Sequence, residues 1–184
     1  VDASGSHGLS CRRSAGRVAR HQYINDILWR AMHRANIPAV KEPTGLSRTD
    51  GKRPDGMTMV PWQEGRAALW DVTVRDTLAD SYIASTSLLA GSAAEEAARQ
   101  KEVKYSQLTG TYLFYAVAIE TLGPMCESGR TFISELGRRT AQVTSDQREI
   151  SFLFQRISVA VQRYNSVCIA GTFKATASEP VDHG

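Results

Sequence analysis

The chain has 184 residues, of which 42% are hydrophobic and 22% charged, and its formal net charge is +3. A chain of this size and composition can bury the core of one globular domain. It contains no run of about 18 apolar residues, which excludes a transmembrane helix, and its first residues lack the apolar stretch of a secretory signal. Three cysteines without CxxC spacing (Cys11, Cys126 and Cys168) argue against a disulfide framework and favour an intracellular protein.

The positive charge is concentrated in the first third of the sequence. Residues 1–53 hold ten Lys and Arg against four Asp and Glu, a net charge of +6. The remaining residues hold twelve against fifteen, a net charge of −3. This distribution indicates a polyanionic partner. The alternative is an ordinary solvated surface, and composition alone favours neither interpretation.

Hydrophobic periodicity predicts a mixed α/β domain in the order helix, three strands, helix, strand and two helices. The predicted helices cover residues 21–35, 93–108, 129–143 and 147–168, and the predicted strands cover residues 37–42, 55–60, 66–74 and 111–120. Ser92 and Glu95 have the spacing of a capping box at the start of the second helix. We expect residues 1–20 to form an irregular basic lead-in and residues 174–184 to form a disordered tail.

Two aspartates are predicted to face each other across the hairpin of the second and third strands. If Gln63 is the middle of a five-residue turn, Val60 faces Arg66 and Asp55 faces Asp71. Opposed side chains lie on one face of the sheet, roughly 4.5–5.5 Å apart. Two carboxylates this close repel each other, and a cation such as Mg²⁺ or Mn²⁺ would remove the conflict. The alternative is a register shifted by one residue, which would leave one aspartate in solvent.

Two lysines and a glutamate are further candidates for this site. Lys101 and Lys104 are three positions apart and therefore share one side of the predicted helix. A lysine near the metal would hold the attacking water or stabilise charge in the transition state. The alternative is that both lysines are only solvated, as most helix lysines are. Glu42, at the end of the first strand, is a candidate third carboxylate.

A family resemblance rests on these same residues. Pro54-Asp55, followed by Asp71-Val72-Thr73 at the end of an apolar strand, resembles the PD-(D/E)xK signature of restriction-like nucleases, with Thr73 in the lysine position. Three segments together are similar to the restriction-like endonuclease domain at the C-terminus of non-LTR retrotransposon reverse transcriptases, in which that lysine lies on the next helix. The segments are Lys52-Arg53-Pro54-Asp55, Trp70-Asp71-Val72-Thr73-Val74 and Gln100-Lys101-Glu102-Val103-Lys104-Tyr105.

The resemblance implies an α/β restriction-endonuclease-like core of order α-β-β-β-α-β with additional C-terminal helices, in a domain of residues 21–173. It implies a Mg²⁺- or Mn²⁺-dependent endodeoxyribonuclease that nicks target DNA for retrotransposition. The implied catalytic residues are Asp55, Asp71, Lys101 and Lys104, with Lys101 the better match for the displaced lysine. The implied metal ligands are the two aspartates, the Val72 carbonyl and Glu42.

The same resemblance implies DNA and an upstream reverse transcriptase region of the same polyprotein as partners, in the nucleus if the source is eukaryotic. We expect phosphate contacts from Arg12, Arg13, Arg17, Arg20, Lys52 and Arg53. His7-Gly8-Leu9-Ser10-Cys11 resembles the last two ligands of a CCHC zinc knuckle. Because a structural zinc site needs four ligands, we expect Zn²⁺ only if the missing knuckle cysteines are present.

Two other functions fit the sequence. The first is a catalytically inactive DNA-binding domain of the same fold, which is consistent with Thr73 in the lysine position. The second is a structural or assembly role for the apolar helices of residues 129–168. Phe152 and Phe154 cannot both face one core, so one of them would meet a partner or a second part of the core.

Overall fold

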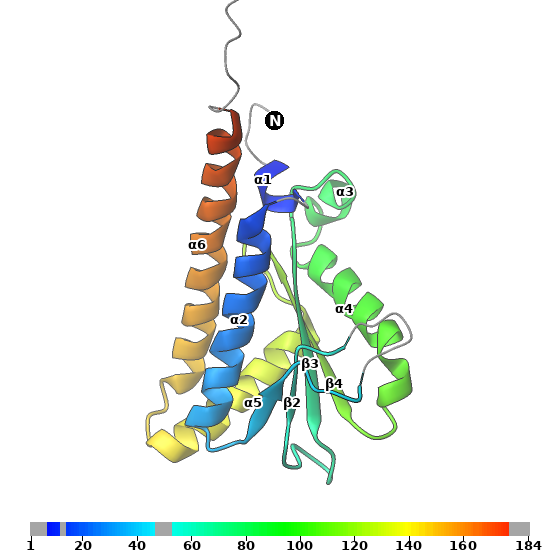
Figure 1. Ribbon diagram of the computed structural model, residues 1–184, viewed down its shortest axis with the longest axis vertical. Helices are drawn as coiled ribbons and strands as arrows, with labels where there is room; N and C mark the ends of the chain where they lie inside the picture. Colours follow the sequence, from blue (N-terminus) through cyan, green and yellow to red (C-terminus); the bar gives the residue numbers. More distant parts are fainter. Residues whose placement is uncertain (1–6, 12–13, 47–52, 177–184) are drawn as a thin grey trace, which may run out of the picture.

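The computed structural model describes residues 7–11, 14–46 and 53–176, and its centre is a four-stranded sheet (Figure 1). The strands are β1 (Ala39–Lys41), β2 (Gly56–Thr58), β3 (Ala68–Arg75) and β4 (Leu113–Glu120), in this order across the sheet. β2 is antiparallel to β1 and β3, whereas β3 and β4 are parallel. The predicted mixed α/β fold is therefore confirmed at this level.

Helices cover both faces of the sheet. α2 (Ala15–Arg34), α5 (Glu127–Thr144) and α6 (Glu149–Thr176) lie on one face, and α4 (Ser92–Lys104) lies on the other (Figure 1). The shorter elements are α1 (His7–Ser10), α3 (Ile83–Thr86) and the 3-10 helix η1 (Ser106–Leu108). Among the described residues, no helix combines the length and the apolar character needed to cross a bilayer.

The alternation of side chains along β3 and β4 separates two cores. Trp70 and Val72 of β3, with Val117 of β4, face α2, α5 and α6 and form the larger core. Ala116 and Ala118 of β4 face the other way, onto the alanines of α4. Because these side chains are small, α4 packs close to the sheet, and its lysines lie within reach of β3.

The prediction of an irregular lead-in over residues 1–20 is wrong for much of that segment, because α1 and the first turns of α2 are helical. The buried face of these turns is not apolar, which is why hydrophobic periodicity missed them. Gly16 packs against Cys168 of α6, where a Cβ would lie 2.7 Å from the sulfur atom. Arg20 is 1% exposed and donates from Nη1 to Asn165 Oδ1 at 2.6 Å.

Two other boundary predictions are wrong. Ser92 does not cap α4; it is the first residue of the helix, and its buried hydroxyl has no hydrogen-bond partner among the described residues. The Glu120 carboxylate of β4 instead accepts the N–H groups of Ala93 and Ala94, at 2.9 and 3.3 Å. At the other end of the chain, α6 continues past Phe173, and the rest of the predicted tail, residues 177–184, lies outside the described residues.

The register of the β2–β3 hairpin is the predicted one. Gly56 pairs with Trp70 and Met57 pairs with Leu69, so the next position along each strand places Asp55 opposite Asp71. The alternative register, shifted by one residue, is therefore excluded for these pairs.

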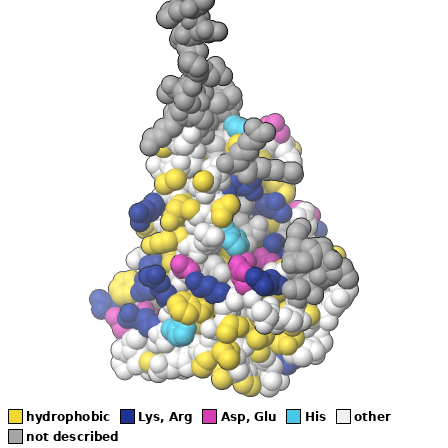
Figure 2. Space-filling view, viewed as in Figure 1, with side chains coloured by type: hydrophobic (Ala, Val, Ile, Leu, Met, Phe, Trp, Pro, Cys, Tyr) yellow, Lys and Arg dark blue, Asp and Glu magenta, His cyan; other side chains and the backbone are white. Residues whose placement is uncertain are grey.

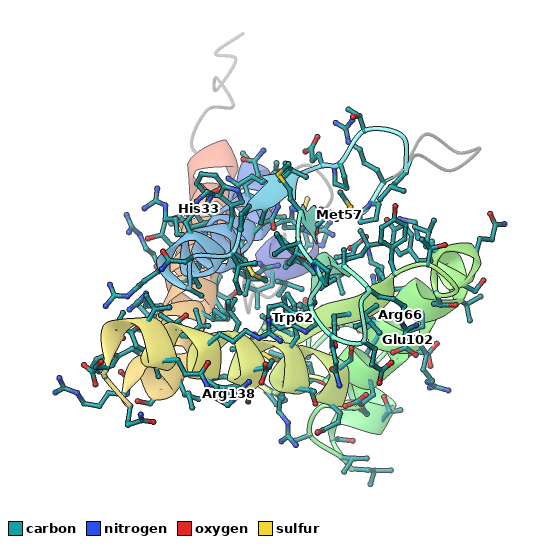
Figure 3. All side chains as sticks on the ribbon, turned by 90° about the horizontal axis from the view of Figure 1, so that it is seen from below. His33, Met57, Trp62, Arg66, Glu102 and Arg138 are labelled. Atoms are coloured by element: carbon teal, nitrogen blue, oxygen red, sulfur yellow. The ribbon has the colours of Figure 1, made fainter. Side chains whose placement is uncertain are left out.

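The turn of this hairpin differs from the prediction. Arg66 forms a bridge with Gln63 rather than with Val60, and the two-residue turn of Glu64 and Gly65 has positive φ at both positions, 52° and 72°. Such a turn matches the twist of a hairpin. Seen from below, Trp62 lies over α5 beside this turn (Figure 3), with its ring centroid 4.0 Å from the Arg139 guanidinium.

Candidate active site

Asp55 is fixed at the edge of the sheet by its backbone and by its side chain. Its N–H donates to the Trp70 carbonyl at 3.0 Å, and its carbonyl accepts the N–H of Glu42 at 2.9 Å. The Asp55 Oδ2 atom accepts the N–H of Val72 at 2.6 Å, and the side chain is 15% exposed. The carboxylate of Asp55 therefore contacts the residue that directly follows Asp71.

The buried side chain of Asn25 links Asp55 to Trp70 by hydrogen bonds. Asn25 of α2 donates from Nδ2 to the Asp55 carbonyl at 3.3 Å, and its Oδ1 accepts the indole N–H of Trp70 at 2.7 Å. Asn25 was missed by the sequence reasoning, although a polar residue on the apolar stripe of Ile24 and Leu28 was a usable signal.

His21 also reaches Asp55, and it was likewise not predicted. Its Nε2 lies 2.9 Å from Asp55 Oδ2. The hydrogen bond to Asp55 raises the pKa of the His21 imidazole above its ordinary 6.5, against the opposing effect of burial. His21 and Asn25 are four positions apart on α2, so the same side of this helix serves Asp55 twice.

Asp71 meets the predicted lysines. Its side chain is 4% exposed, and its Oδ1 accepts a hydrogen bond from Lys101 Nζ at 2.5 Å. Lys104 Nζ lies farther away, 3.9 Å from Asp71 Oδ2, and donates to the Tyr105 hydroxyl at 2.7 Å. Tyr105 in turn donates to the carbonyl of Arg53 at 2.9 Å, which ties α4 to the segment that precedes Asp55. Of the two lysines, Lys101 is therefore the direct partner of Asp71.

The site is charged and partly open to solvent. Lys101 and Lys104 are 22% and 20% exposed, and His21 is 39% exposed, whereas the Asp71 carboxylate lies beneath them. Near the middle of the molecular face in Figure 2, histidine, acidic and basic side chains lie side by side. A negatively charged group of a substrate would meet the two lysines first, with the Asp71 carboxylate behind them.

The donor set fits a magnesium-type ion but not an all-protein metal cage. Within the described residues, no group of three or more His, Cys, Asp or Glu side chains is arranged to hold a metal. Mg²⁺ commonly takes only one or two carboxylates, and water and substrate phosphates complete its octahedron. Asp55 and Asp71 meet that requirement, and Asp55 Oδ1 makes no hydrogen bond with a described residue.

Glu42 does not join the two aspartates as the third carboxylate. It ends β1 with a positive φ of 47°, and its side chain is 62% exposed in an ion pair with Arg53. The prediction that Glu42 completes the coordination is therefore not supported, because the carboxylate points to the surface ion pair.

The predicted phosphate-binding residues fall into three groups. Arg12, Arg13 and Lys52 lie outside the described residues. Arg17 and Arg53 are accessible, although the side chain of each contacts one described residue, Arg17 the Ser10 carbonyl and Arg53 the Glu42 carboxylate. A direct phosphate contact of Arg20 does not fit its burial, because its guanidinium joins α2 to Asn165 of α6.

The two predicted zinc ligands lie one helical turn apart. The N–H of Cys11 donates to the carbonyl of His7 at 2.9 Å, and the Cys11 thiol forms no disulfide. The described part of the chain offers no third ligand beside them. Two ligands are insufficient for a structural zinc site, which needs four.

In comparisons with known proteins, no family model matches this sequence, and no curated protein matches it either.

Proposed function

We propose that this chain is a metal-dependent DNA endonuclease with a restriction-endonuclease-like core. The observation that carries the proposal is that Asp55, directly before β2, lies opposite Asp71 of β3 and accepts the N–H of Val72, while Lys101 of α4 donates to Asp71. Apart from the short α3 and η1, the order of α2, β1, β2, β3, α4 and β4 is the α-β-β-β-α-β order that the sequence resemblance implies. By the same resemblance, the nick would prime reverse transcription by an upstream part of the same polyprotein.

Asp55 and Asp71, with the Val72 carbonyl as a further ligand, would hold Mg²⁺ or Mn²⁺. The bound metal would lower the pKa of a water molecule and shield the charge that develops on the phosphoryl group. Hydrogen bonds within the protein hold the Asp55 carboxylate in the orientation that metal binding would require. The Val72 N–H and His21 both hold Asp55 Oδ2, so the other oxygen is left for the ion.

Lys101 would supply the ammonium group, because Thr73 occupies the position of the signature lysine. In the structure it neutralises the buried Asp71, and its 22% exposure leaves it accessible to a phosphate. During hydrolysis it would donate to the attacking water or to a non-bridging oxygen of the phosphodiester, where negative charge accumulates. Lys104 would act less directly, since its Nζ hydrogen bonds to Tyr105.

Nicking of supercoiled plasmid tests the proposal. With Mg²⁺ or Mn²⁺ we expect conversion to open circles, and with EDTA none. Asp71→Asn and Lys101→Met should each reduce the rate by about 10²–10³-fold, as loss of one transition-state contact does. Asp26→Asn is the matched control, because Asp26 forms an ion pair with Lys41 away from Asp71 and should leave nicking unchanged.

The results separate this function from a catalytically inactive DNA-binding domain. That alternative has one observation in its favour: both carboxylates already have side-chain partners, Asp71 with two lysines and Asp55 with His21. Binding of DNA without cleavage under either metal would favour it. Nicking that survives EDTA, or that is unchanged by Asp71→Asn, would remove the active-site assignment.

A further inference from the structure

A cleft of about 470 Å³ lies between the first turns of α2 and the end of β3. Its lining consists of Arg17, Val18, Arg20, His21, Thr73 and Val74. His21 connects the cleft to the candidate active site, because the same side chain pairs with Asp55. Among the described residues, no acidic side chain lines it. The cleft is therefore a cationic space that opens directly next to the site of the proposed cleavage.

The cleft exists because β3 extends beyond its neighbour. β2 pairs with Leu69 and Trp70, and Asp55 reaches the N–H of Val72, so the edge of β3 beyond Val72 is not covered by β2. N–H groups two positions apart in a strand point to the same edge, which directs the Val74 N–H toward the side that faces the cleft. Backbone donors at such an edge suit an anion.

Thr73 is the side chain that departs from the nuclease signature, and it lines this cleft. Its hydroxyl makes no hydrogen bond with another described residue. A lysine at this position would extend three atoms further than threonine, whereas threonine places a short donor at the wall. Threonine in place of lysine therefore leaves room in the cleft and provides a hydrogen-bond donor two residues after Asp71.

Two guanidinium groups give the cleft its charge. Arg17 uses one Nη1 contact, at 2.8 Å to the Ser10 carbonyl, and the remaining donors of its guanidinium make no hydrogen bond with a described residue. Arg20 lies deeper, 1% exposed, with a buried Nε that has no partner among the described residues. Its Nη2 also donates to the Leu9 carbonyl at 3.5 Å, and the nearby charge of Asp76 favours its charged form. An anion in the cleft would add to this compensation of a buried charge.

We propose that this cleft binds a phosphate of the DNA strand adjacent to the phosphodiester held at Asp55 and Asp71. Arg17 and the Thr73 hydroxyl would contact the phosphate, and Arg20 would contribute its positive charge from beneath. The proposal rests on the proposed nuclease function for the position of the strand, and it assigns Thr73 to substrate binding rather than to catalysis.

Binding of a fluorescent DNA duplex in EDTA, at several salt concentrations, tests the cleft without requiring cleavage. Arg17→Gln should reduce the slope of log K against log salt by about 0.9, the loss of one phosphate contact. Thr73→Val should weaken binding by about three- to tenfold, the effect of one lost hydrogen bond. Arg30→Gln is the matched control, because Arg30 lies on the same helix in a different groove and forms no ion pair with a described residue.

The EDTA experiment distinguishes the two proposals. If the variants weaken DNA binding in EDTA as predicted, but the wild-type chain does not nick plasmid with Mg²⁺ or Mn²⁺, the phosphate subsite stands and the nuclease function is refuted. Wild-type affinity and slope in both Arg17→Gln and Thr73→Val would overturn the subsite even if nicking is observed.

A second measurement does not depend on variants. In NMR titrations of the wild-type chain, the amides of Thr73 and Val74 should shift when the duplex is added in EDTA. No shift at these amides would overturn the proposal. Equal shifts with inorganic phosphate at the same concentration would also overturn it, because the cleft would then be a site for the free ion.

Discussion

Replacing Gly56 with alanine tests whether the packing of Trp70 sets the position of Asp55. A Cβ on Gly56 would lie 2.0 Å from Cζ2 and 2.3 Å from Cε2 of the Trp70 ring, distances that real contacts do not show. The ring is fully buried, and its N–H donates to Asn25 at 2.7 Å, so it cannot retreat without losing that hydrogen bond. The strain must therefore move either the indole or the backbone next to Asp55.

The expected cost follows from overpacking. Extra atoms in a close-packed core destabilise by about 1–3 kcal/mol, and a rigid ring in direct conflict favours the upper value. In a chain of this length, 1 kcal/mol corresponds to about 2–4 °C in Tm, so about 3 kcal/mol lowers Tm by about 6–12 °C. Under the proposed function, nicking well below Tm should also fall, because the carboxylate of Asp55 is displaced.

Thermal unfolding followed by circular dichroism measures this effect, with Gly110→Ala as the matched control. A Cβ on Gly110 would meet no atom within 4 Å, and the residue needs no positive φ, so alanine there should leave Tm nearly unchanged. Equal Tm values for the Gly56→Ala and Gly110→Ala variants would refute the reasoning.

Two further predictions concern stability. The folded pKa of His21 is raised by Asp55, so its contribution should be fully present below the ordinary value of 6.5 and disappear as pH rises through the folded pKa. Urea unfolding of wild type and His21→Gln should show a difference that shrinks from pH 5.5 to pH 8.5; a constant difference would contradict it. Arg20→Met leaves Asn165 Oδ1 without its buried donor and should cost about 1–3 kcal/mol, whereas exposed Arg30→Met should cost little. Equal losses would show that Arg20 does not join α2 to α6.

Much of the candidate site could be predicted from local patterns. Strand periodicity and the hairpin constraint placed Asp55 opposite Asp71, and helical spacing placed Lys101 and Lys104 on one side of α4. The register was correct although the turn was not. The turn lies at Glu64 and Gly65 rather than around Gln63. Residues 59–61 lie outside the β2–β3 ladder, so this difference does not change the pairing of β2 with β3.

Local patterns could not show which elements meet. Arg20 reads as a surface cation, yet its partner Asn165 is 145 positions away on a helix that covers it. His21 and Asn25 gain their roles only because α2 begins at Ala15 and lies along the edge of the sheet at Asp55.

The sequence by itself determined the period of each element and the residues that share a face, because these depend on backbone geometry over a few residues. Only the tertiary structure decided that Lys101 reaches Asp71, that Glu42 turns to the surface and that Thr73 lines a cleft. Each of these depends on how far one element extends past another, and that distance is fixed by packing across the whole core.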